Sequence, residues 1–269
     1  MILIKTPQQI RLMAEGGRIL AEIMQELEKA VRPGVITKEL DRLAESLIFS
    51  YGGKCSFKGY KGQNSGLGKP YPACLCTSIN EEIVHAVPSG RILKEGDIIS
   101  LDLGVEWRGF HTDMAVTAPV GKISEESKKL IEVTKNALEI GIKEIKPGNF
   151  LGDISRAIQK YVESQGFNVV RELCGHGIGK NIHEDPEILN SVSFDKETAD
   201  KVKYFGDAKL ILKEGMVLCL EPMVTIGDWR IKKSKDGFGY GTKDGSLSAH
   251  FEHTIAVTKD GYQILTELK

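Results

Sequence analysis

Apolar residues recur at helical spacing in four segments of the chain. In the first segment, Ile10, Met13 and Leu20 fall on one side, as expected of a helix that buries one face. Each segment ends at a glycine or at a Pro-Gly pair, and neither continues a helix readily. The predicted helices cover residues 7–31, 37–52, 125–145 and 147–166, with Thr37 as the N-cap of the second.

A hydrophobic run with two embedded acids predicts a β-hairpin over residues 93–117, with its turn centred between Trp107 and Arg108. In this register Asp102 and Asp113 lie directly opposite each other, and such partners have Cβ atoms about 5 Å apart. A bulge at Gly109 would shift this register. Two carboxylates this close repel each other unless a cation lies between them. Taken alone, they are equally well explained as scattered acids on a solvated face.

The same pattern returns in the second half of the chain. The segment LKEGDIISLD ends at Asp102, and the segment LKEGMVLCLE ends at Glu221. In the second half, Glu252 follows Glu221 and lies in FEHTIAVT. In the first half, Asp113 follows Asp102 and lies in the similar DMAVT. The midpoint between Glu221 and Glu252 is Asp236-Gly237, a dipeptide typical of hairpin turns.

Each half therefore consists of two helices followed by acid-bearing strands. Duplication of a whole α+β unit fits this order better than a short repeat does. We expect one domain over residues 1–269, built from two related halves (about 1–120 and 121–269), with antiparallel sheets covered by helices. Residues 55–72 and 228–245 lack periodicity and are predicted to be loops, either functional segments or surface insertions.

The composition is that of a soluble globular protein. The 269 residues are 41% hydrophobic and carry a formal net charge of −1, which argues against an electrostatic nucleic-acid binder. We expect no signal peptide, and no run approaches the ~20 apolar residues of a membrane span. The cysteines are odd in number and irregularly spaced, so we expect reduced cytoplasmic thiols rather than a disulfide framework or a structural zinc site. They are Cys55, Cys74, Cys76, Cys174 and Cys219.

A histidine joins the four acids as a candidate metal ligand. His176 lies between glycines in GHGIG, and imidazole with carboxylates is a ligand set suited to first-row divalent metals. GHGIGK is not a phosphate loop, because Cys174 and Asn181 occupy positions that need Gly and Ser/Thr. Cys174 is better explained as a buried cysteine than as a nucleophile. His85 lies in an apolar stretch and, on its own, is better explained as a core histidine.

Five motifs, in order, resemble those of the type I (bacterial-type) methionine aminopeptidases of peptidase family M24. They are SINEEIVHAVP, LDLG, GHGIG, LEPM and SAHFEHTIAVT, and the resemblance covers almost the entire chain. It implies the duplicated, pseudo-two-fold pita-bread fold and a single catalytic metallopeptidase domain. The implied activity is removal of the initiator methionine from nascent proteins and peptides whose second residue is small, by metal-activated water attack on the first peptide bond.

The resemblance also implies roles for individual residues. The implied ligands of two divalent ions (Co, Mn, Fe or Zn) are Asp102, Asp113, His176, Glu221 and Glu252. Asp113 and Glu252 would bridge both ions, and Glu221 would also shuttle a proton of the attacking water. His183 would contact the substrate near the scissile carbonyl, and His85 near the amide nitrogen. The implied methionine pocket contains Tyr71, Cys76, Ile182 and Phe238, the last two standing where many bacterial members have Phe and Trp.

The resemblance further implies N-terminal methionyl peptides and nascent chains as partners, with transient ribosome contact. A cytoplasmic monomer is the default expectation, with no membrane and no nucleic-acid substrate. Two alternatives stay open. A proline-specific peptidase of the same fold would share the ligands but usually carries an additional N-terminal domain. A non-catalytic binding protein of this fold usually lacks some of the five ligands, and none is missing here.

Overall fold

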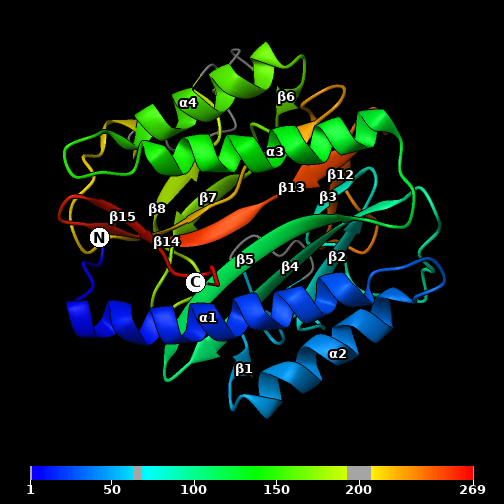
Figure 1. Cartoon of the computed structure of the whole chain (residues 1–269), viewed down its shortest axis with the longest axis horizontal. Coiled ribbons are helices and arrows are strands. Elements are labelled where there is room, and N and C mark those ends of the chain that lie inside the picture. Colours follow the sequence, from blue (N-terminus) through cyan, green and yellow to red (C-terminus); the bar gives the residue numbers. More distant parts are fainter. Residues whose placement is uncertain (1, 63–67, 193–206, 269) are drawn as a thin grey trace.

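The protein combines two pairs of helices with an antiparallel sheet. The computed structural model describes residues 2–62, 68–192 and 207–268. In Figure 1, α1 and α2 lie along the lower side, α3 and α4 along the upper side, and most of the strands lie between the two pairs. No helix in these residues is both long and apolar enough to cross a membrane. The helices are α1 (Pro7–Ala30), α2 (Thr37–Ser50), α3 (Glu125–Lys143) and α4 (Leu151–Ser164), which confirms the four predicted segments.

The start of α2 differs from the prediction. Ile36 is the N-cap residue, and Thr37 is the first residue inside the helix. The Thr37 hydroxyl donates to the Ser89 carbonyl at 3.0 Å and accepts from the Ser89 N–H at 2.8 Å. Thr37 therefore joins the helix to a distant loop, and its side chain does not cap the helix. At the start of α1, by contrast, the Thr6 hydroxyl accepts from the Gln9 N–H.

Nine strands form the main sheet, in the order β1-β4-β5-β14-β9-β7-β8, with β15 on β14 and β2 on β4. Helix α1 packs against β4 and β5, and α3 packs against β5 and β9. The acid-bearing strands of both halves are therefore neighbours in the middle of the sheet. The strands are β1 (Lys54–Cys55), β2 (Leu75–Ile79), β4 (Ile98–Trp107), β5 (Phe110–Pro119), β7 (Cys174–Gly177), β8 (Glu184–Leu189), β9 (Val217–Leu220), β14 (Glu252–Thr258) and β15 (Gly261–Ile264).

Two three-stranded sheets complete the strands of the described residues. One has the order β13-β10-β6 and the other β11-β12-β3. A short 3₁₀ helix, η1 (Asp207–Lys209), precedes β9. The strands of the two small sheets are β3 (Glu82–Val84), β6 (Asn168–Val169), β10 (Met223–Thr225), β11 (Ile231–Lys233), β12 (Tyr240–Thr242) and β13 (Ser248–His250).

The β4–β5 hairpin is displaced by two residues from the predicted pairing. Its turn is Arg108-Gly109, and both residues have positive φ angles (50° and 82°), as in a two-residue type I′ turn. Asp113 consequently pairs with Gly104 and not with Asp102. The prediction that Asp102 and Asp113 lie directly opposite each other was therefore wrong. Because side chains alternate between faces with a period of two, the displacement still leaves both acids on one face, as diagonal neighbours.

The chain from β9 to β14 forms an antiparallel ribbon centred at Asp236-Gly237, as the midpoint of the two glutamates predicts. Every pairing along it has the same centre, as shown by the pairs Leu220–His253, Met223–His250 and Ile231–Thr242. The prediction that residues 228–245 are only loop was wrong, because β11 and β12 lie within them. In the predicted loop 55–72, Cys55 is the last residue of β1, and the described residues from 56 to 72 contain no helix or strand, as predicted.

One expectation about the cysteines was also wrong. Cys55 and Cys74 form a disulfide, and their Cα atoms are 5.1 Å apart. Since β5 occupies one edge of β4, the strands β1 and β2 share the other edge, which brings the end of β1 next to the start of β2. The remaining cysteines, Cys76, Cys174 and Cys219, are free.

Candidate metal centre

Three carboxylates converge on one face of the main sheet. Asp102 on β4 and Glu252 on β14 are both paired with Ala115 on β5, so the three residues form one row across neighbouring strands. Asp113 lies two residues from Ala115 and therefore points to the same face. One oxygen from each of the three acids lies within 4.8 Å of the other two. The small side chain of Ala115 leaves the space in which they meet.

His176 joins this cluster from β7. It pairs with Cys219 on β9, and the ligand atoms of His176, Cys219 and Glu252 lie within 4.8 Å of one another. Its Nδ1 lies 2.9 Å from the Gly177 carbonyl oxygen, which can only accept, so Nδ1 carries the ring proton. Nε2 therefore presents a lone pair, and it lies 3.7 Å from Glu221 Oε1. The structure thus brings together all five predicted ligands.

Burial controls the charge of the four acids. Loss of solvation, with repulsion from Asp113, raises the pKa of Asp102 and Glu252 well above the usual range. Loss of solvation, followed by repulsion from Asp102 and Asp113, does the same for the pKa of Glu221. Burial raises the pKa of Asp113 to about 7. Without a neutralising charge, burial and mutual repulsion would favour the protonated forms of these acids.

The donor atoms of the cluster fit divalent cations. In the described part of the chain, Asp102 Oδ1 and Glu252 Oε1 are buried and have no hydrogen-bond partner, which is costly unless something positive binds them. Burial, followed by the nearby His183, lowers the pKa of His176 to about 3, so its ring is neutral and able to bind a metal. Buried carboxylates with a neutral imidazole are ligands for first-row metals.

The sequence did not single out two further residues beside the acids. Burial, followed by the neighbouring Glu252, raises the pKa of Cys219 well above that of a free thiol, so it stays protonated and is a poor ligand. The Thr254 hydroxyl donates to the Asp113 carbonyl and accepts from the Asp113 N–H, both at 2.8 Å. It thereby fastens β14 to β5 beside the cluster. No motif in the sequence indicated either contact.

The two predicted substrate histidines border the cluster. The centroid of the His183 ring lies 4.4 Å from that of His176, and its Nδ1 lies 2.7 Å from the Tyr60 hydroxyl. His85 has a φ angle of 60°, a left-handed conformation that is rare outside glycine. Solvent reaches both side chains, so His85 is not a core histidine. The surrounding protein still desolvates them and lowers the pKa of each to about 4.

The predicted methionine-pocket residues form one apolar group next to the acids. Tyr71, Cys76 and Ile182 are buried in a single cluster, and Phe238 packs against it. The ring centroids of Tyr71 and Phe238 are 5.5 Å apart in an edge-to-face contact. Cys76 on β2 pairs with Asp102 on β4, which places the group directly beside the carboxylates.

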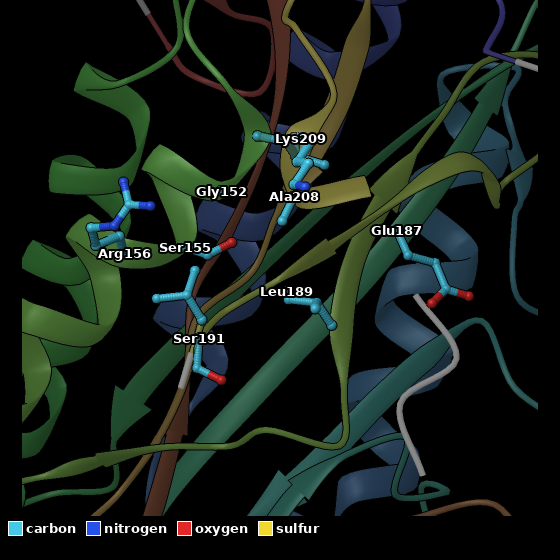
Figure 2. Close-up of a pocket in the computed structure, with 10 residues that line it drawn as sticks. Gly152, Ser155, Arg156, Glu187, Leu189, Ser191, Ala208 and Lys209 are labelled. Atoms are coloured by element: carbon cyan, nitrogen blue, oxygen red, sulfur yellow. The ribbon is translucent and has the colours of Figure 1, made fainter. Parts of the chain in front are cut away.

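Other clusters and cavities lie apart from this centre. Glu45 lies near Cys55 and Cys74, but both sulfurs are committed to the disulfide. A cavity of about 220 Å³ lies between α4, β8 and η1. Figure 2 shows Ser155 and Arg156 from α4 and Glu187 from β8 at its walls. None of the predicted site residues lines it.

Comparison with known proteins gives matches over the full length. The profile of metallopeptidase family M24 matches residues 11–259. Methionine aminopeptidase 1 of Bacillus subtilis is 46% identical over 268 residues, with 100% of each chain covered. Methionine aminopeptidase of Escherichia coli is 42% identical over 267 residues, covering 98% of this chain and 94% of its own.

The structural matches agree. A crystal structure of methionine aminopeptidase from Thermotoga maritima has a TM-score of 0.89 at 42% identity, with 100% of each chain covered. A prolidase from Pyrococcus furiosus has a TM-score of 0.74 at 21% identity, covering 99% of this chain and 66% of its own. At that identity the prolidase likeness concerns the fold alone. The expected α+β pita-bread fold is confirmed.

Proposed function

The chain belongs to metallopeptidase family M24, and from this premise we propose that it is a methionine aminopeptidase. It removes the N-terminal methionine from peptides and nascent proteins whose second residue is small, by attack of water on the first peptide bond. Full-length identity of 40–46% to methionine aminopeptidases supports the activity. The observation that carries the proposal is the meeting of five ligand-type side chains from both halves of the chain in one buried site.

Two divalent ions fit these residues. In the proposal, Asp113 and Glu252 would be ligands shared by both ions, Asp102 would be a further ligand of one, and His176 and Glu221 would be further ligands of the other. Bound divalent ions would lower the pKa of water and polarise the scissile carbonyl. The donor set suits Co, Mn, Fe or Zn equally, so the proposal does not choose among these metals.

The remaining chemistry belongs to side chains of the protein. Glu221 lies beside His176 and accepts a proton from the attacking water, which it then passes to the leaving amine. His183 donates a hydrogen bond to the scissile carbonyl, and His85 contacts the amide nitrogen. Because the pKa of each histidine is about 4, both rings are neutral near pH 7 and act as hydrogen-bonding groups, not as cations.

The methionine side chain occupies the apolar group beside the acids. Tyr71, Ile182 and Phe238 enclose it, and Cys76 lies next to Asp102. An unbranched thioether packs well against such aromatic and aliphatic surfaces. A methionine side chain bound there would bring the first peptide bond over the carboxylates, which would account for a preference for the N-terminal residue.

The proposal also covers organisation and partners. The enzyme is one catalytic domain of two related halves (about 1–120 and 121–269), and it acts as a cytoplasmic monomer on nascent chains with transient ribosome contact. The near-neutral net charge of −1 supports peptides as substrates over nucleic acids.

A substrate comparison tests the proposed activity. We expect the metal-loaded protein to release methionine from Met-Ala-Ser and to leave Xaa-Pro dipeptides intact. Hydrolysis of Xaa-Pro in preference to Met-Ala-Ser would instead indicate the proline-specific peptidases that share the fold. A Glu221→Ala variant separates catalysis from a binding role, because a binding function would survive the substitution and peptide hydrolysis would not.

A further inference from the structure

His250 is a buried histidine that the proposed chemistry does not use. Its side chain is 1% exposed, and neither ring nitrogen has a hydrogen-bond partner within the described residues. A buried polar group without a partner destabilises the folded protein. Such a group in a core position calls for an explanation beyond packing.

The backbone of His250 is firmly held. It lies at the end of β13, paired with Met223 on β10. Its N–H donates to the Thr117 hydroxyl at 2.9 Å, and its carbonyl accepts from the same hydroxyl at 2.8 Å. The imidazole is therefore presented from a fixed point of the fold.

The ring faces one of the predicted metal ligands. Nε2 of His250 lies 3.6 Å from Glu221 Oε2, only slightly longer than a hydrogen bond. The other oxygen, Glu221 Oε1, lies 3.7 Å from Nε2 of His176. Glu221 therefore stands between two imidazoles, with one oxygen directed at each.

We propose that His250 is a positioning residue for the metal centre. Its Nε2–H donates to Glu221 Oε2 when the centre is loaded, and so keeps Oε1 turned toward the cation beside His176. Groups that orient a ligand in this way commonly contribute 10- to 100-fold to metal affinity. The inference rests on the proposed function, because it takes Glu221 to be a ligand.

Metal affinity tests the inference without relying on activity. The metal-stripped protein is titrated calorimetrically with Mn²⁺ and with Co²⁺. We expect His250→Leu, which removes the donor, to weaken binding about 10- to 100-fold. We expect His250→Gln, whose amide can still donate, to stay within a few-fold of the unchanged protein.

A neighbouring histidine provides the matched control. His253 also lies in the ribbon that ends in β14, but its Nδ1 is 2.9 Å from the Thr266 hydroxyl. His253→Leu should leave the affinity for both metals unchanged. Thermal unfolding of the metal-free proteins gives a second measurement, in which His250→Leu should not lower the melting temperature because it removes an unpartnered polar group.

The possible failures are distinguishable. If the unchanged protein binds neither metal, both the proposed function and the inference about His250 are contradicted. If the unchanged protein binds metal and His250→Leu binds it as tightly, the inference alone is overturned. Equal losses of metal affinity in His250→Gln and His250→Leu would contradict a positioning role and would indicate that the imidazole itself binds the metal. A lower melting temperature with unchanged affinity would reduce His250 to a packing residue.

Discussion

Asp102 and Glu252 belong to different halves of the chain, yet both are paired with the same residue, Ala115. This alanine is 1% exposed and fills the row between the two carboxylates. Its small size is therefore a condition for the acids to meet at one point. A larger side chain here would occupy the space in which a cation is expected.

The substitution Ala115→Val tests this condition. We expect metal affinity to fall about 10- to 100-fold, because the added methyl groups push the carboxylates apart. Overpacking should lower the free energy of unfolding by about 1–3 kcal/mol. Titration calorimetry and urea unfolding measure the two effects.

Ala118→Val is the control for overpacking. Ala118 lies on the same strand, but its side chain is on the other face, in the main hydrophobic core. The Ala118→Val protein should have a lower free energy of unfolding than the unchanged protein but the same metal affinity. Equal affinities for Ala115→Val and the unchanged protein would contradict the arrangement described above.

Metal binding should release protons, and more of them at low pH. The pKa of Asp113 is about 7 in the absence of a cation, and those of the other three acids are also raised. At pH 6 Asp113 is mostly protonated and must lose its proton to bind a metal, whereas at pH 8 it is mostly ionised. Apparent affinity should therefore rise with pH.

Calorimetric titration in two buffers of different ionisation enthalpy counts the protons released. His176, with a pKa of about 3, is already neutral and should add none. The same proton count at pH 6 and pH 8 would show that Asp113 is not a ligand or is ionised throughout. Asp113→Asn should reduce the difference between the two pH values.

A buried ion pair joins the N-terminal segment to the start of β8, next to His183. Lys5 Nζ lies 2.7 Å from Glu184 Oε2, and both side chains are 5% exposed. Lys5→Met leaves a buried carboxylate without its partner, so we expect the free energy of unfolding to fall by about 3–5 kcal/mol. Urea unfolding measures the change.

The exposed pair Arg18–Glu22 provides a comparison. Its side chains are 64% and 29% exposed, so Arg18→Met should cost less than about 0.5 kcal/mol. The double variant Lys5→Met/Glu184→Gln should recover much of the loss, because no unpaired charge remains. Similar costs for the Lys5 and Arg18 variants would mean that the buried pair is effectively solvated.

Phe238 should contribute to methionine binding without affecting the metal. Removing its ring in Phe238→Ala should raise KM and lower kcat/KM for Met-Ala-Ser about 10- to 100-fold, because burial of such a side chain contributes about 1.5–3 kcal/mol. Phe49→Ala is the matched control, because Phe49 is 58% exposed on α2. This substitution should change neither KM nor kcat/KM. A loss of metal affinity in Phe238→Ala would argue against a purely apolar role.

Much of the architecture could be predicted from the sequence, because the residues that mark helix ends and turns are recognisable from local sequence patterns. Pro-Gly pairs mark the helix limits, and the equal spacing of Glu221 and Glu252 about Asp236-Gly237 predicts the ribbon. A register shift at Gly109 could be anticipated in the first hairpin, but the two-residue displacement itself could not. It depends on a positive φ angle at Arg108, a residue that does not favour this conformation.

Features that depend on distant pairings were also beyond the sequence. The disulfide exists because β1 and β2 share one edge of β4, although Cys55 and Cys74 stand in an apparently irregular pattern. The burial of His250 beside Glu221 depends on β13, a strand of three residues that lies just beyond the predicted loop 228–245. Composition and spacing carry no trace of either contact.

The most direct test of the account is release of free methionine from Met-Ala-Ser by the metal-stripped protein, with Mn²⁺, Fe²⁺, Co²⁺ and Zn²⁺ added back singly. The account predicts that at least one metal restores cleavage and that Asp113→Ala abolishes the restored activity. No cleavage with any metal, in a protein that demonstrably binds two ions per chain, would contradict the assignment as an aminopeptidase.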